Sequence, residues 1–517
     1  MISKTWNALN QIRSQALLAA LSGVLYFVGF CGFDQFYLSW FCLVPILWAL
    51  DTPTLSPRQA LVIAWIFGFI THLGGYTWIT YMLKHFGYLP TPAALGLYAL
   101  LCLAQGSLLA AWGFGVFLLQ RKYHLPSLIT GPLLMVVCEW LYPALFPSYL
   151  ANSQYKMLPL IQSADIIGLL GLSGLMTLSS CVAYQWLRRL LQRTRLPASP
   201  LLKLGTALFA LLFGLNLAYG LHSLKRVQHT LDTSHQRVSL GLVQSNMGIY
   251  QKRSQPHEGL RRHQEQSLQL EAQGADLIIW PESGYYYPIA STETNVQESV
   301  RGSLKTPLLF GGIQYDRQSG ERKIHNTAFL TDAEGAITAT YNKTYLLAFG
   351  EYLPLGEWFP WLYKLSPNTS HFYPGTHTRP LELNGIRYGV LICYEDILPR
   401  FVQKVMQENP HVLVNMTNDA WFGDTREPTI HLALAIFRSI EQRRYLARAT
   451  NTGISAIISP TGEITQQSGT FERASLLGSV VPLQEKTFYS RWGDWVGYLS
   501  LLALVGMLIG RRPSRSS

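Results

Sequence analysis

Cys393 is the residue whose type and position most directly suggest covalent chemistry. It ends an apolar run, Arg387–Cys393, and the polar residues Tyr394, Glu395 and Asp396 follow it. A nucleophile at the end of a strand, on a sharp turn, is presented at the rim of a sheet beside backbone N–H groups. A buried cysteine of the core is the alternative interpretation, and Cys393 taken alone favours that alternative.

The sequence contains six cysteines, and the other five lie in long apolar stretches: Cys31, Cys42, Cys102, Cys138 and Cys181. Cysteine in such a setting behaves as a small hydrophobic residue. Six cysteines in 517 residues are too few for a disulfide scaffold. We therefore expect Cys393 to be a free thiol with no partner in its own domain.

Three charged residues occupy comparable places after short apolar runs. Glu282 follows the run Leu277–Trp280, and Lys343 follows Ile337–Tyr341. Glu351 lies in a segment of apolar residues and turn formers. A lone carboxylate or lysine in such a turn is usually solvated, so Glu282 and Lys343 each favour a surface role when considered separately. Glu351 requires a partner, and its spacing does not identify one.

The elements that would position these residues alternate between strands and helices, which indicates an α/β domain. The expected strands are 238–244, 275–280, 307–314, 326–330, 337–341, 387–393, 411–416 and 455–458, and the expected helices are 256–273, 397–408 and 428–448. Several strands follow one another without a helix between them. This pattern favours antiparallel edges or a sandwich of two sheets.

The composition excludes a single water-soluble enzyme and a disordered chain. Hydrophobic residues make up 49% of the 517 residues and charged residues only 14%, whereas soluble domains average about 25% charged. The formal net charge is +11, which in an apolar chain indicates cationic loops on the inner side of a membrane. We expect a multi-span α-helical membrane domain at 1–225, an extramembrane domain at 226–490, and a closing span with a basic tail at 491–517.

Apolar runs of the length that a bilayer requires, about 20 residues, predict seven spans before the extramembrane domain and one after it. They are 15–33, 36–50, 60–81, 92–120, 126–146, 160–187, 203–222 and 492–510. Lys and Arg concentrate in alternate connections, including Arg188, Arg189, Arg193, Arg195 and the tail residues Arg511, Arg512 and Arg515. This bias predicts that both termini are cytoplasmic and that the extramembrane domain lies on the opposite side. Glycines 168, 171 and 174 could allow two helices to approach closely.

Four short motifs occur in a characteristic order. Trp280-Pro-Glu282, Tyr341-Asn-Lys343, Phe349-Gly-Glu351 and Cys393-Tyr-Glu395 together resemble the Glu-Lys-Cys signature of the carbon–nitrogen hydrolase (nitrilase) superfamily. Within it, Thr417-Asn-Asp-Ala-Trp-Phe-Gly423 and Arg448-Ala-Thr-Asn-Thr-Gly-Ile454 look like the apolipoprotein N-acyltransferase family. That family has the same arrangement of spans, an extramembrane domain and a closing span.

The resemblance implies a nitrilase-like αββα sandwich with a defined catalytic set. Cys393 would be the nucleophile, Glu282 the general base, and Lys343 the cation that stabilises the oxyanion with the N–H of Tyr394. Glu351 and Glu395 would support the lysine and the local loop. No cofactor, metal or nucleic acid is implied.

The reaction implied by the resemblance joins two lipid substrates. An acyl chain would pass from a phospholipid to Cys393 as a thioester, and then to the free N-terminal amine of the diacylglyceryl-cysteine of an apolipoprotein. The protein would lie in a bacterial inner membrane, with its catalytic domain in the periplasm and in contact with membrane lipids. Two departures from the family pattern concern substrate detail: residues 246–253 lack an expected tryptophan, and Ala348 replaces an expected proline.

Two rival functions remain open. A membrane-tethered amidase would use the same residues with water as the acceptor, and a non-catalytic scaffold would retain only the fold. The aromatic segment 353–363, which follows Glu351, could dip into the membrane or pack on the core of its own domain. Trp421 and Phe422 could line an acyl pocket or belong to that core. His257, Glu258 and His263 lack the spacing of a helical zinc site.

Overall fold

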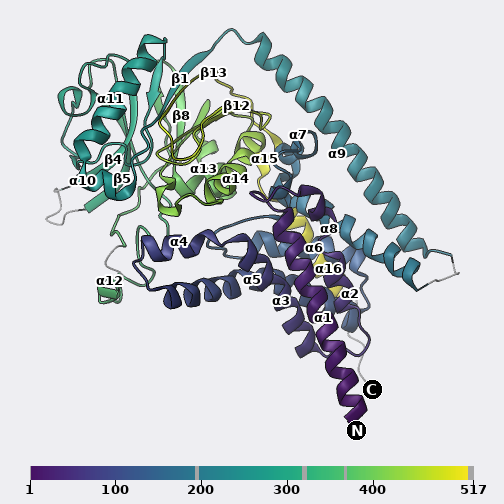
Figure 1. Ribbon diagram of the computed structural model, residues 1–517. Helices are drawn as coiled ribbons and strands as arrows, with labels where there is room; N and C mark the ends of the chain where they lie inside the picture. The colour runs from purple at the N-terminus through teal and green to yellow at the C-terminus, as the bar shows by residue number, and fades with distance from the viewer. Residues whose placement is uncertain (1, 193–196, 317–322, 366–368, 511–517) are drawn as a thin grey trace. The chain divides into compact units, whose positions relative to one another are not determined.

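The computed structural model describes residues 2–192, 197–316, 323–365 and 369–510. The chain forms two compact units (Figure 1). The helical unit comprises Met1–Thr80, Leu89–Ser223 and Trp492–Ser517, and the sheet unit comprises Tyr81–Tyr88 and Leu224–Arg491. Residues 81–88 therefore lie with the sheet unit, although the sequence interpretation assigned residues 1–225 to one membrane domain. Arg193, Arg195 and the three tail arginines lie outside the described residues.

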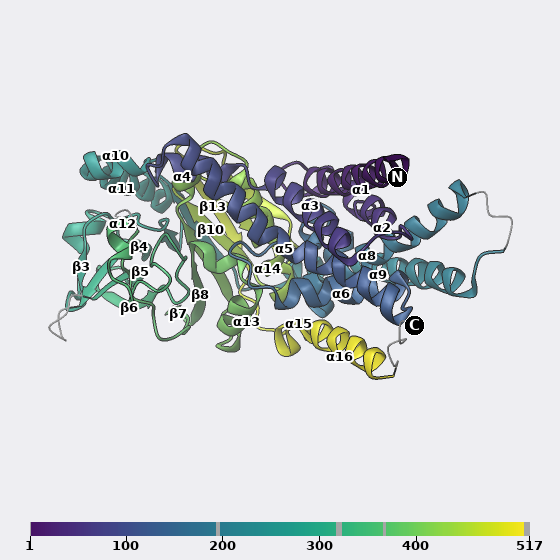
Figure 2. The same ribbon diagram turned by 90° about the horizontal axis from the view of Figure 1, so that it is seen from below.

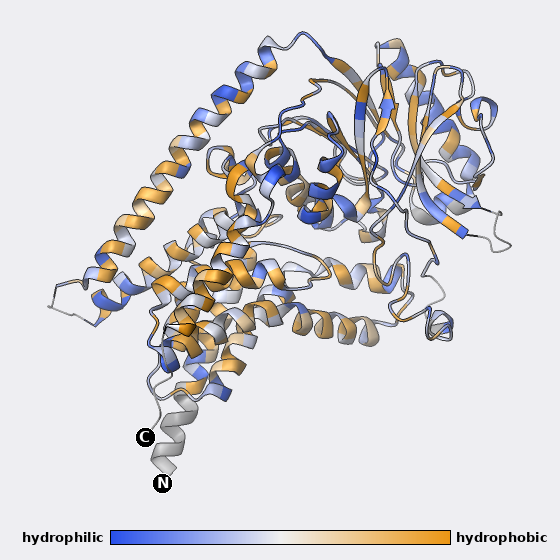
Figure 3. Ribbon diagram, turned by 180° about the vertical axis from the view of Figure 1, so that it is seen from behind, coloured by the Kyte–Doolittle hydropathy of each residue, from blue (hydrophilic) through white to orange (hydrophobic). Residues whose placement is uncertain are grey.

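The helical unit consists of long apolar helices joined by short turns, and Figure 3 shows the hydrophobic residues along them. The elements are α1 (Ile2–Gly29), η1 (Phe36–Trp40), α2 (Val44–Leu50), α3 (Pro57–Gly75), α5 (Thr91–Tyr123), α6 (Ser127–Leu141), η2 (Leu150–Gln154), α7 (Leu158–Ile161), α8 (Ala164–Leu191), α9 (Pro200–Thr233) and α16 (Trp495–Ile509). Helix α9 continues past Ser223 into the sheet unit.

Four described helices are long and apolar enough to cross a membrane: the part of α1 from Ile12 to Gly29, α5, α8 and α9. A fifth span results if α3 and α4 (Trp78–His85) form one broken span. Shorter apolar helices lie at Phe36–Leu50, Ser127–Leu141 and Trp495–Ile509. An apolar helix thus lies at each of the eight expected places, while the number and direction of the spans remain predictions.

Two helices of this unit approach closely at a glycine pair that the sequence interpretation did not select. A Cβ atom on Gly68 of α3 would lie 2.0 Å from the carbonyl oxygen of Gly106 of α5, so only glycine fits there. Of the expected glycines, Gly168 has φ 61° and interrupts the helical conformation of α8. Gly174 does face α6, because a Cβ atom on it would lie 3.1 Å from Val136.

The sheet unit contains two mixed sheets. The first has the strand order β13-β1-β2-β4-β5-β6, with β3 paired to β4. Its strands are β1 (Val238–Gln244), β2 (Leu277–Ile279), β3 (Ile289–Ala290), β4 (Leu308–Asp316), β5 (Lys323–Thr331), β6 (Ile337–Asn342) and β13 (Ala474–Val480). Strands β1, β2 and β4 are parallel, and β5, β6 and β13 add antiparallel neighbours.

The second sheet has the order β12-β11-β10-β9-β8-β7. Its strands are β7 (Leu381–Leu383), β8 (Ile386–Ile392), β9 (Val412–Thr417), β10 (Leu446–Thr450), β11 (Ala456–Ile458) and β12 (Ile464–Gln467). The three central strands, β8, β9 and β10, are parallel. They are entirely buried except at Arg387, as expected for parallel strands covered on both faces.

The two sheets pack on each other through β1 and β10 and through β12 and β13, and helices cover their outer faces (Figures 1 and 2). Helix α11 (Pro256–Ala272) covers the first sheet, and α13 (Pro399–Gln407) and α14 (Glu427–Gln442) cover the second. The expected αββα sandwich is therefore confirmed. The remaining short elements are α10 (Ile249–Ser254), η3 (Gln297–Arg301), α12 (Leu362–Leu365), η4 (Cys393–Ile397), η5 (Asp419–Phe422) and α15 (Phe488–Trp492).

One expected helix extended too far along the chain. A single helix was expected over 428–448, but α14 ends at Gln442 and Leu446 begins the buried strand β10. Arg443 stops the helix in a left-handed conformation, φ 48°, without the glycine that usually marks such an end. Pairing of β10 with β9 and β11 overrides the helix propensity of its Leu, Ala and Arg residues.

Candidate active site

Cys393 lies where β8 gives way to the turn η4, in a strained conformation. Its φ is +53°, a left-handed value that costs energy for a residue with a Cβ atom. Such a turn exposes a nucleophile at the rim of a sheet. Burial raises the pKa of the Cys393 thiol well above its usual value, a nearby Glu282 carboxylate raises it further, and Lys343 lowers it. The resting group is therefore the neutral thiol.

Glu282 follows β2 and is buried in the same cavity as Cys393. Its Oε1 accepts a hydrogen bond from Asn326 Nδ2 at 2.7 Å, whereas its buried Oε2 has no hydrogen-bond partner among the described residues. Burial raises the pKa of Glu282, although Lys343 opposes part of that rise. A carboxylate with a raised pKa and a free oxygen is well suited to accept a proton.

Lys343 follows β6 and is almost completely buried. Its Nζ lies 2.8 Å from Glu351 Oε2 and 3.7 Å from Glu282 Oε1. Burial alone would lower the pKa of Lys343, but the carboxylates of Glu351 and Glu282 outweigh burial and raise it above the usual value. The ammonium group is therefore a permanent cation that two carboxylates hold in place.

The two supporting carboxylates make different contacts. Glu351 accepts from Leu347 N at 2.9 Å as well as from Lys343. Glu395 accepts from the backbone N–H groups of Ile392, Thr344 and Tyr345 at 2.7 to 2.9 Å and from Tyr341 Oη. Burial raises the pKa of Glu395 to about 7, and the hydrogen bond from Ile392 N opposes the rise. Glu395 therefore ties the cysteine turn to the loop after Lys343.

Tyr394, the next residue after the nucleophile candidate, is also buried. Its ring centroid lies 6.0 Å from that of Tyr345, in the loop that follows Lys343. The structure thus brings the expected site residues Glu282, Lys343, Glu351 and Cys393 together around one cavity. Tyr394 and Glu395 follow Cys393 in η4 and are not among the described residues that line the cavity.

The cavity has a volume of about 220 Å³ and contains two polar residues that sequence reasoning missed. Asn326, in the middle of β5, donates to both Glu282 and Glu351, at 2.7 and 2.9 Å. Lys252 is buried and donates to the carbonyl oxygen of Ser283 at 3.1 Å. Burial lowers the pKa of Lys252 to about 8, although Glu282 opposes the shift. The only sequence signal for Lys252 was its place in the segment 246–253.

Apolar and aromatic side chains form another part of the cavity wall. This part includes Met82, Phe86, Tyr285, Tyr286, Leu347, Phe372, Trp421 and Phe422. The rings of Phe86 and Trp421 meet edge to face, with centroids 4.2 Å apart. Trp421 and Phe422 therefore line the cavity, and Phe422 is buried as well. This wall could accommodate a hydrocarbon chain beside the polar residues.

Most large apolar side chains of the aromatic segment 353–363 are exposed, although Leu353 is buried. Leu355, Trp358, Phe359 and Trp361 are all exposed, and Trp358 is 79% exposed. The alternative in which this segment packs on its own domain is therefore wrong for these four side chains. Exposed apolar side chains in a group usually mark a surface that binds something.

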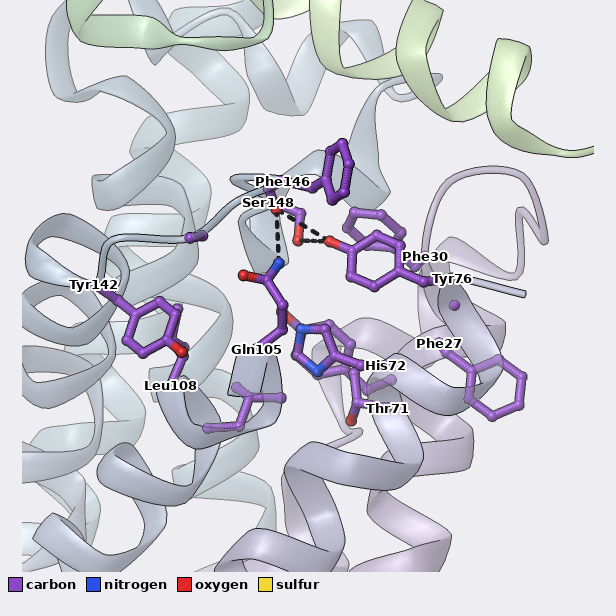
Figure 4. A pocket seen from close by; sticks show the side chains of 14 residues that line it. Phe27, Phe30, Thr71, His72, Tyr76, Gln105, Leu108, Tyr142, Phe146 and Ser148 are labelled. Atoms are coloured by element: carbon purple, nitrogen blue, oxygen red, sulfur yellow. Dashed lines mark hydrogen bonds between the residues drawn. The ribbon is translucent and has the colours of Figure 1, made fainter. Parts of the chain in front are cut away.

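A second pocket lies within the helical unit (Figure 4). Gln105 there binds the backbone of Leu145 and Phe146, and Tyr76 binds Phe146 and Ser148. These bonds satisfy a non-helical connection after α6, which a membrane environment would require. None of the 14 described residues that line this pocket is a cysteine or a carboxylate, so the sheet unit holds the better candidate for covalent catalysis.

Two family models together match most of this chain. The family model described as the N-terminal domain of apolipoprotein N-acyltransferase matches residues 22–182, and the carbon-nitrogen hydrolase model matches residues 239–482. Among solved structures, Saccharomyces cerevisiae Nit3, a member of branch 10 of the nitrilase superfamily, aligns with a TM-score of 0.38 and 16% identity. The alignment covers 48% of this chain and 91% of that one.

Full-length relatives give the most extensive match. The apolipoprotein N-acyltransferase of Geobacter metallireducens is 31% identical over 97% of this chain and 96% of its own length. The enzyme of the same name from Bdellovibrio bacteriovorus is 30% identical over 95% of this chain and 93% of its own length. The match runs through both units of the structure, and the chain belongs to the apolipoprotein N-acyltransferase family.

Proposed function

We propose that this protein transfers a fatty acyl chain from a phospholipid to the free N-terminal amine of a diacylated apolipoprotein, through a thioester on Cys393. The observation that carries the proposal is a single cavity with four features. It contains the thiol of Cys393 on a strained backbone, the carboxylate of Glu282 with one oxygen that has no hydrogen-bond partner among the described residues, the fixed ammonium of Lys343, and an apolar wall. The family membership supports the same reaction.

In the first half-reaction, Glu282 accepts the thiol proton as Cys393 attacks the ester carbonyl carbon of the phospholipid. The carbonyl oxygen becomes an oxyanion, which the Lys343 ammonium and the backbone N–H of Tyr394 stabilise. A preorganised donor of this kind contributes about 3–4 kcal/mol to the transition state. The tetrahedral intermediate then collapses and expels the lysophospholipid alkoxide, which takes the proton back from Glu282.

In the second half-reaction, the uncharged amine of the lipoprotein attacks the thioester carbonyl. The same cation stabilises the second oxyanion, and Glu282 removes a proton from the amine nitrogen. The carbon–sulfur bond breaks, an amide forms, and the proton passes to the departing thiolate to restore Cys393. The apolar wall at Trp421 and Phe86 limits access of water, which would otherwise hydrolyse the thioester.

The membrane setting follows from the nature of both substrates. We assign the apolar helices to a bacterial inner membrane and the sheet unit to its periplasmic side, because Lys and Arg concentrate in the opposite connections. Exposed His235 provides a test. A His235→Cys variant should react with a membrane-impermeant maleimide in intact spheroplasts, whereas reaction only after lysis would reverse the orientation.

Intact mass spectrometry of the purified protein tests the covalent step. Incubation with a phospholipid and no amine should add the mass of one acyl chain to the wild type and none to Cys393→Ala. Neutral hydroxylamine should remove the added mass, because it cleaves thioesters readily. An unchanged wild-type mass with intact lipid would contradict acyl transfer and favour a small-molecule amidase.

A further inference from the structure

A second group of charged residues lies behind the cysteine turn, and the mechanism above does not use it. We call Asp396, Asp419, Glu427, His431 and Arg448 the buried charge cluster. Asp396, Asp419 and Arg448 have no exposed surface, and His431 and Glu427 are less than 10% exposed. Two of its members, Asp419 and Arg448, belong to the motifs that carry the family resemblance but had no assigned role.

The cluster connects the two turns that carry cavity residues. Asp396 lies in η4, three residues after Cys393, and Asp419 begins η5, which carries Trp421 and Phe422. His431 of α14 bridges them: its Nε2 lies 2.9 Å from Asp396 Oδ1 and its Nδ1 lies 3.2 Å from Asp419 Oδ1. A histidine that donates to two carboxylates at once must carry both ring protons.

Arg448 makes a parallel connection from β10. Its Nη1 donates to Asp396 Oδ2 at 2.7 Å, and its Nη2 donates to Asp419 Oδ2 at 3.1 Å. Two cations therefore hold the same two carboxylates. Breaking a buried pair on one side leaves an uncompensated buried charge, which is strongly destabilising.

The sheet register extends this connection to the nucleophile itself. Arg448, Asn415 and Leu391 are paired neighbours across β10, β9 and β8. Arg448 Nη1 donates to Asn415 Oδ1 at 2.7 Å, and Asn415 Nδ2 donates to the carbonyl oxygen of Cys393 at 3.1 Å. A chain of two hydrogen bonds thus runs from Arg448 to the backbone of the strained residue.

The charges of the cluster balance without an additional ion. Burial and Arg448 oppose the imidazolium, but Asp396 and Asp419 raise the pKa of His431 to about 10. Burial and the neighbouring Asp419 raise the pKa of Glu427 well above its usual value, which favours its neutral form. Ligand atoms of Asp419, Glu427 and His431 lie within 4.8 Å of one another. However, the two cations already face these carboxylates, so we interpret the group as an ionic cluster.

We propose that His431 and Arg448 are positioning residues that clamp η4, the cysteine turn, to η5, the turn that carries Trp421 and Phe422. This clamp keeps Cys393 directed at the cavity despite its strained backbone. The chemical consequence rests on the proposed function, since the clamp would serve acyl transfer. The clamp itself, however, can be tested on the thiol alone.

The test compares His431→Gln with Glu441→Gln. Both residues lie on α14, and Glu441 pairs with Arg438 at 2.8 Å in an equally buried ion pair. The rate at which iodoacetamide alkylates Cys393 is measured from pH 6 to 10 by peptide mass spectrometry. The clamp predicts that the Cys393 profile of His431→Gln is displaced from that of the wild type, whereas Glu441→Gln retains the wild-type profile.

The same variants are then tested for acyl-enzyme formation from phospholipid. We expect the rate of acyl-enzyme formation to fall roughly a hundredfold in His431→Gln. A displacement of a reacting group by about 1 Å typically lowers a rate by this factor. We also expect partial recovery in His431→Lys, which restores a positive charge. If His431→Gln and the wild type give superimposable alkylation profiles, the clamp is overturned, even if His431→Gln unfolds at a lower temperature. If the profiles differ but the wild type forms no acyl-enzyme, the clamp stands and the proposed function fails.

Discussion

The two buried lysines of the catalytic cavity lie in contrasting surroundings. Lys343 lies 2.8 and 3.7 Å from two carboxylates, whereas the hydrogen bond of Lys252 is to a neutral carbonyl, 3.1 Å away. Burial disfavours the ammonium form of both. The two carboxylates outweigh burial and raise the pKa of Lys343. For Lys252 only Glu282 opposes burial, and burial lowers the pKa to about 8.

Both lysines are buried, so burial does not explain the difference between their pKa values. The number of nearby carboxylates decides whether the ammonium group keeps its charge or loses it near neutral pH. Lys343 retains its charge over the whole physiological range and can serve as the electrostatic partner of an oxyanion. Lys252 changes charge near neutral pH.

The largest effect is expected for Lys343→Met. The substitution removes the oxyanion cation and leaves Glu282 and Glu351 without their shared ammonium. We expect acyl-enzyme formation to fall by about 10²–10³, the usual cost of one oxyanion donor, as measured by time-resolved intact mass spectrometry. The melting temperature of each preparation serves as the control for folding. A rate within threefold of the wild type would remove Lys343 from the mechanism.

Asn326→Leu should have the next largest effect. Asn326 donates to both carboxylates, and its loss leaves two buried oxygens with one donor fewer. We expect a loss of about 1–3 kcal/mol in unfolding free energy, measured by thermal unfolding in detergent. Thr331→Val, at the far end of β5, is the matched control, because Thr331 donates only to a backbone carbonyl at 3.3 Å. Equal losses in both variants would mean that Asn326 has no special electrostatic role.

Lys252→Met should have a smaller effect with a distinctive pH dependence. The pKa of Lys252 is about 8, so the wild-type amine is charged below pH 8 and neutral above it. We expect wild-type acylation rates to show a transition near pH 8 that Lys252→Met lacks, and a loss of about tenfold below that pH, as for one charge-assisted hydrogen bond. Identical pH profiles for the two proteins would show that Lys252 does not influence the site.

The smallest effect is expected at Trp358, which is 79% exposed and is not among the described residues that line the catalytic cavity. Trp358→Ser should leave the unfolding free energy within about 0.5 kcal/mol, as is usual for surface changes. It should weaken binding of the protein to phospholipid nanodiscs severalfold, because exposed tryptophan favours the bilayer interface. Unchanged binding would assign the exposed segment 353–363 to another partner.

The parts of the site that sequence reasoning predicted share a structural cause. Cys393, Glu282 and Lys343 each follow a strand, and the sequence shows this place as an apolar run that ends in polar residues. Their catalytic roles came only from the resemblance of the four motifs, because each residue taken alone favoured a core or surface role. Asn326 and Lys252 were missed for the opposite reason. Asn326 lies in the middle of a strand, and Lys252 contacts Ser283, 31 positions away, so only the tertiary structure reveals their partners.

The fold shows the same division between local and tertiary causes. Strand β1 was predicted with its observed ends, because its apolar run is bounded by polar residues on both sides. Strand β10 was included in a helix, because its residues are good helix formers and only its pairing with β9 makes them a strand. The close contact between Gly68 and Gly106 depends on helix packing that the spacing of glycines did not reveal.

One chase experiment tests the central claim most directly. The enzyme is acylated at Cys393 with a labelled phospholipid, separated from excess lipid, and mixed with a diacylated lipopeptide that has a free N-terminal amine. The proposed reaction predicts that the label leaves the protein at a rate set by the lipopeptide and appears in it as an N-terminal amide. Release of the label as free fatty acid, at a rate independent of the lipopeptide, would contradict acyl transfer and identify a hydrolase.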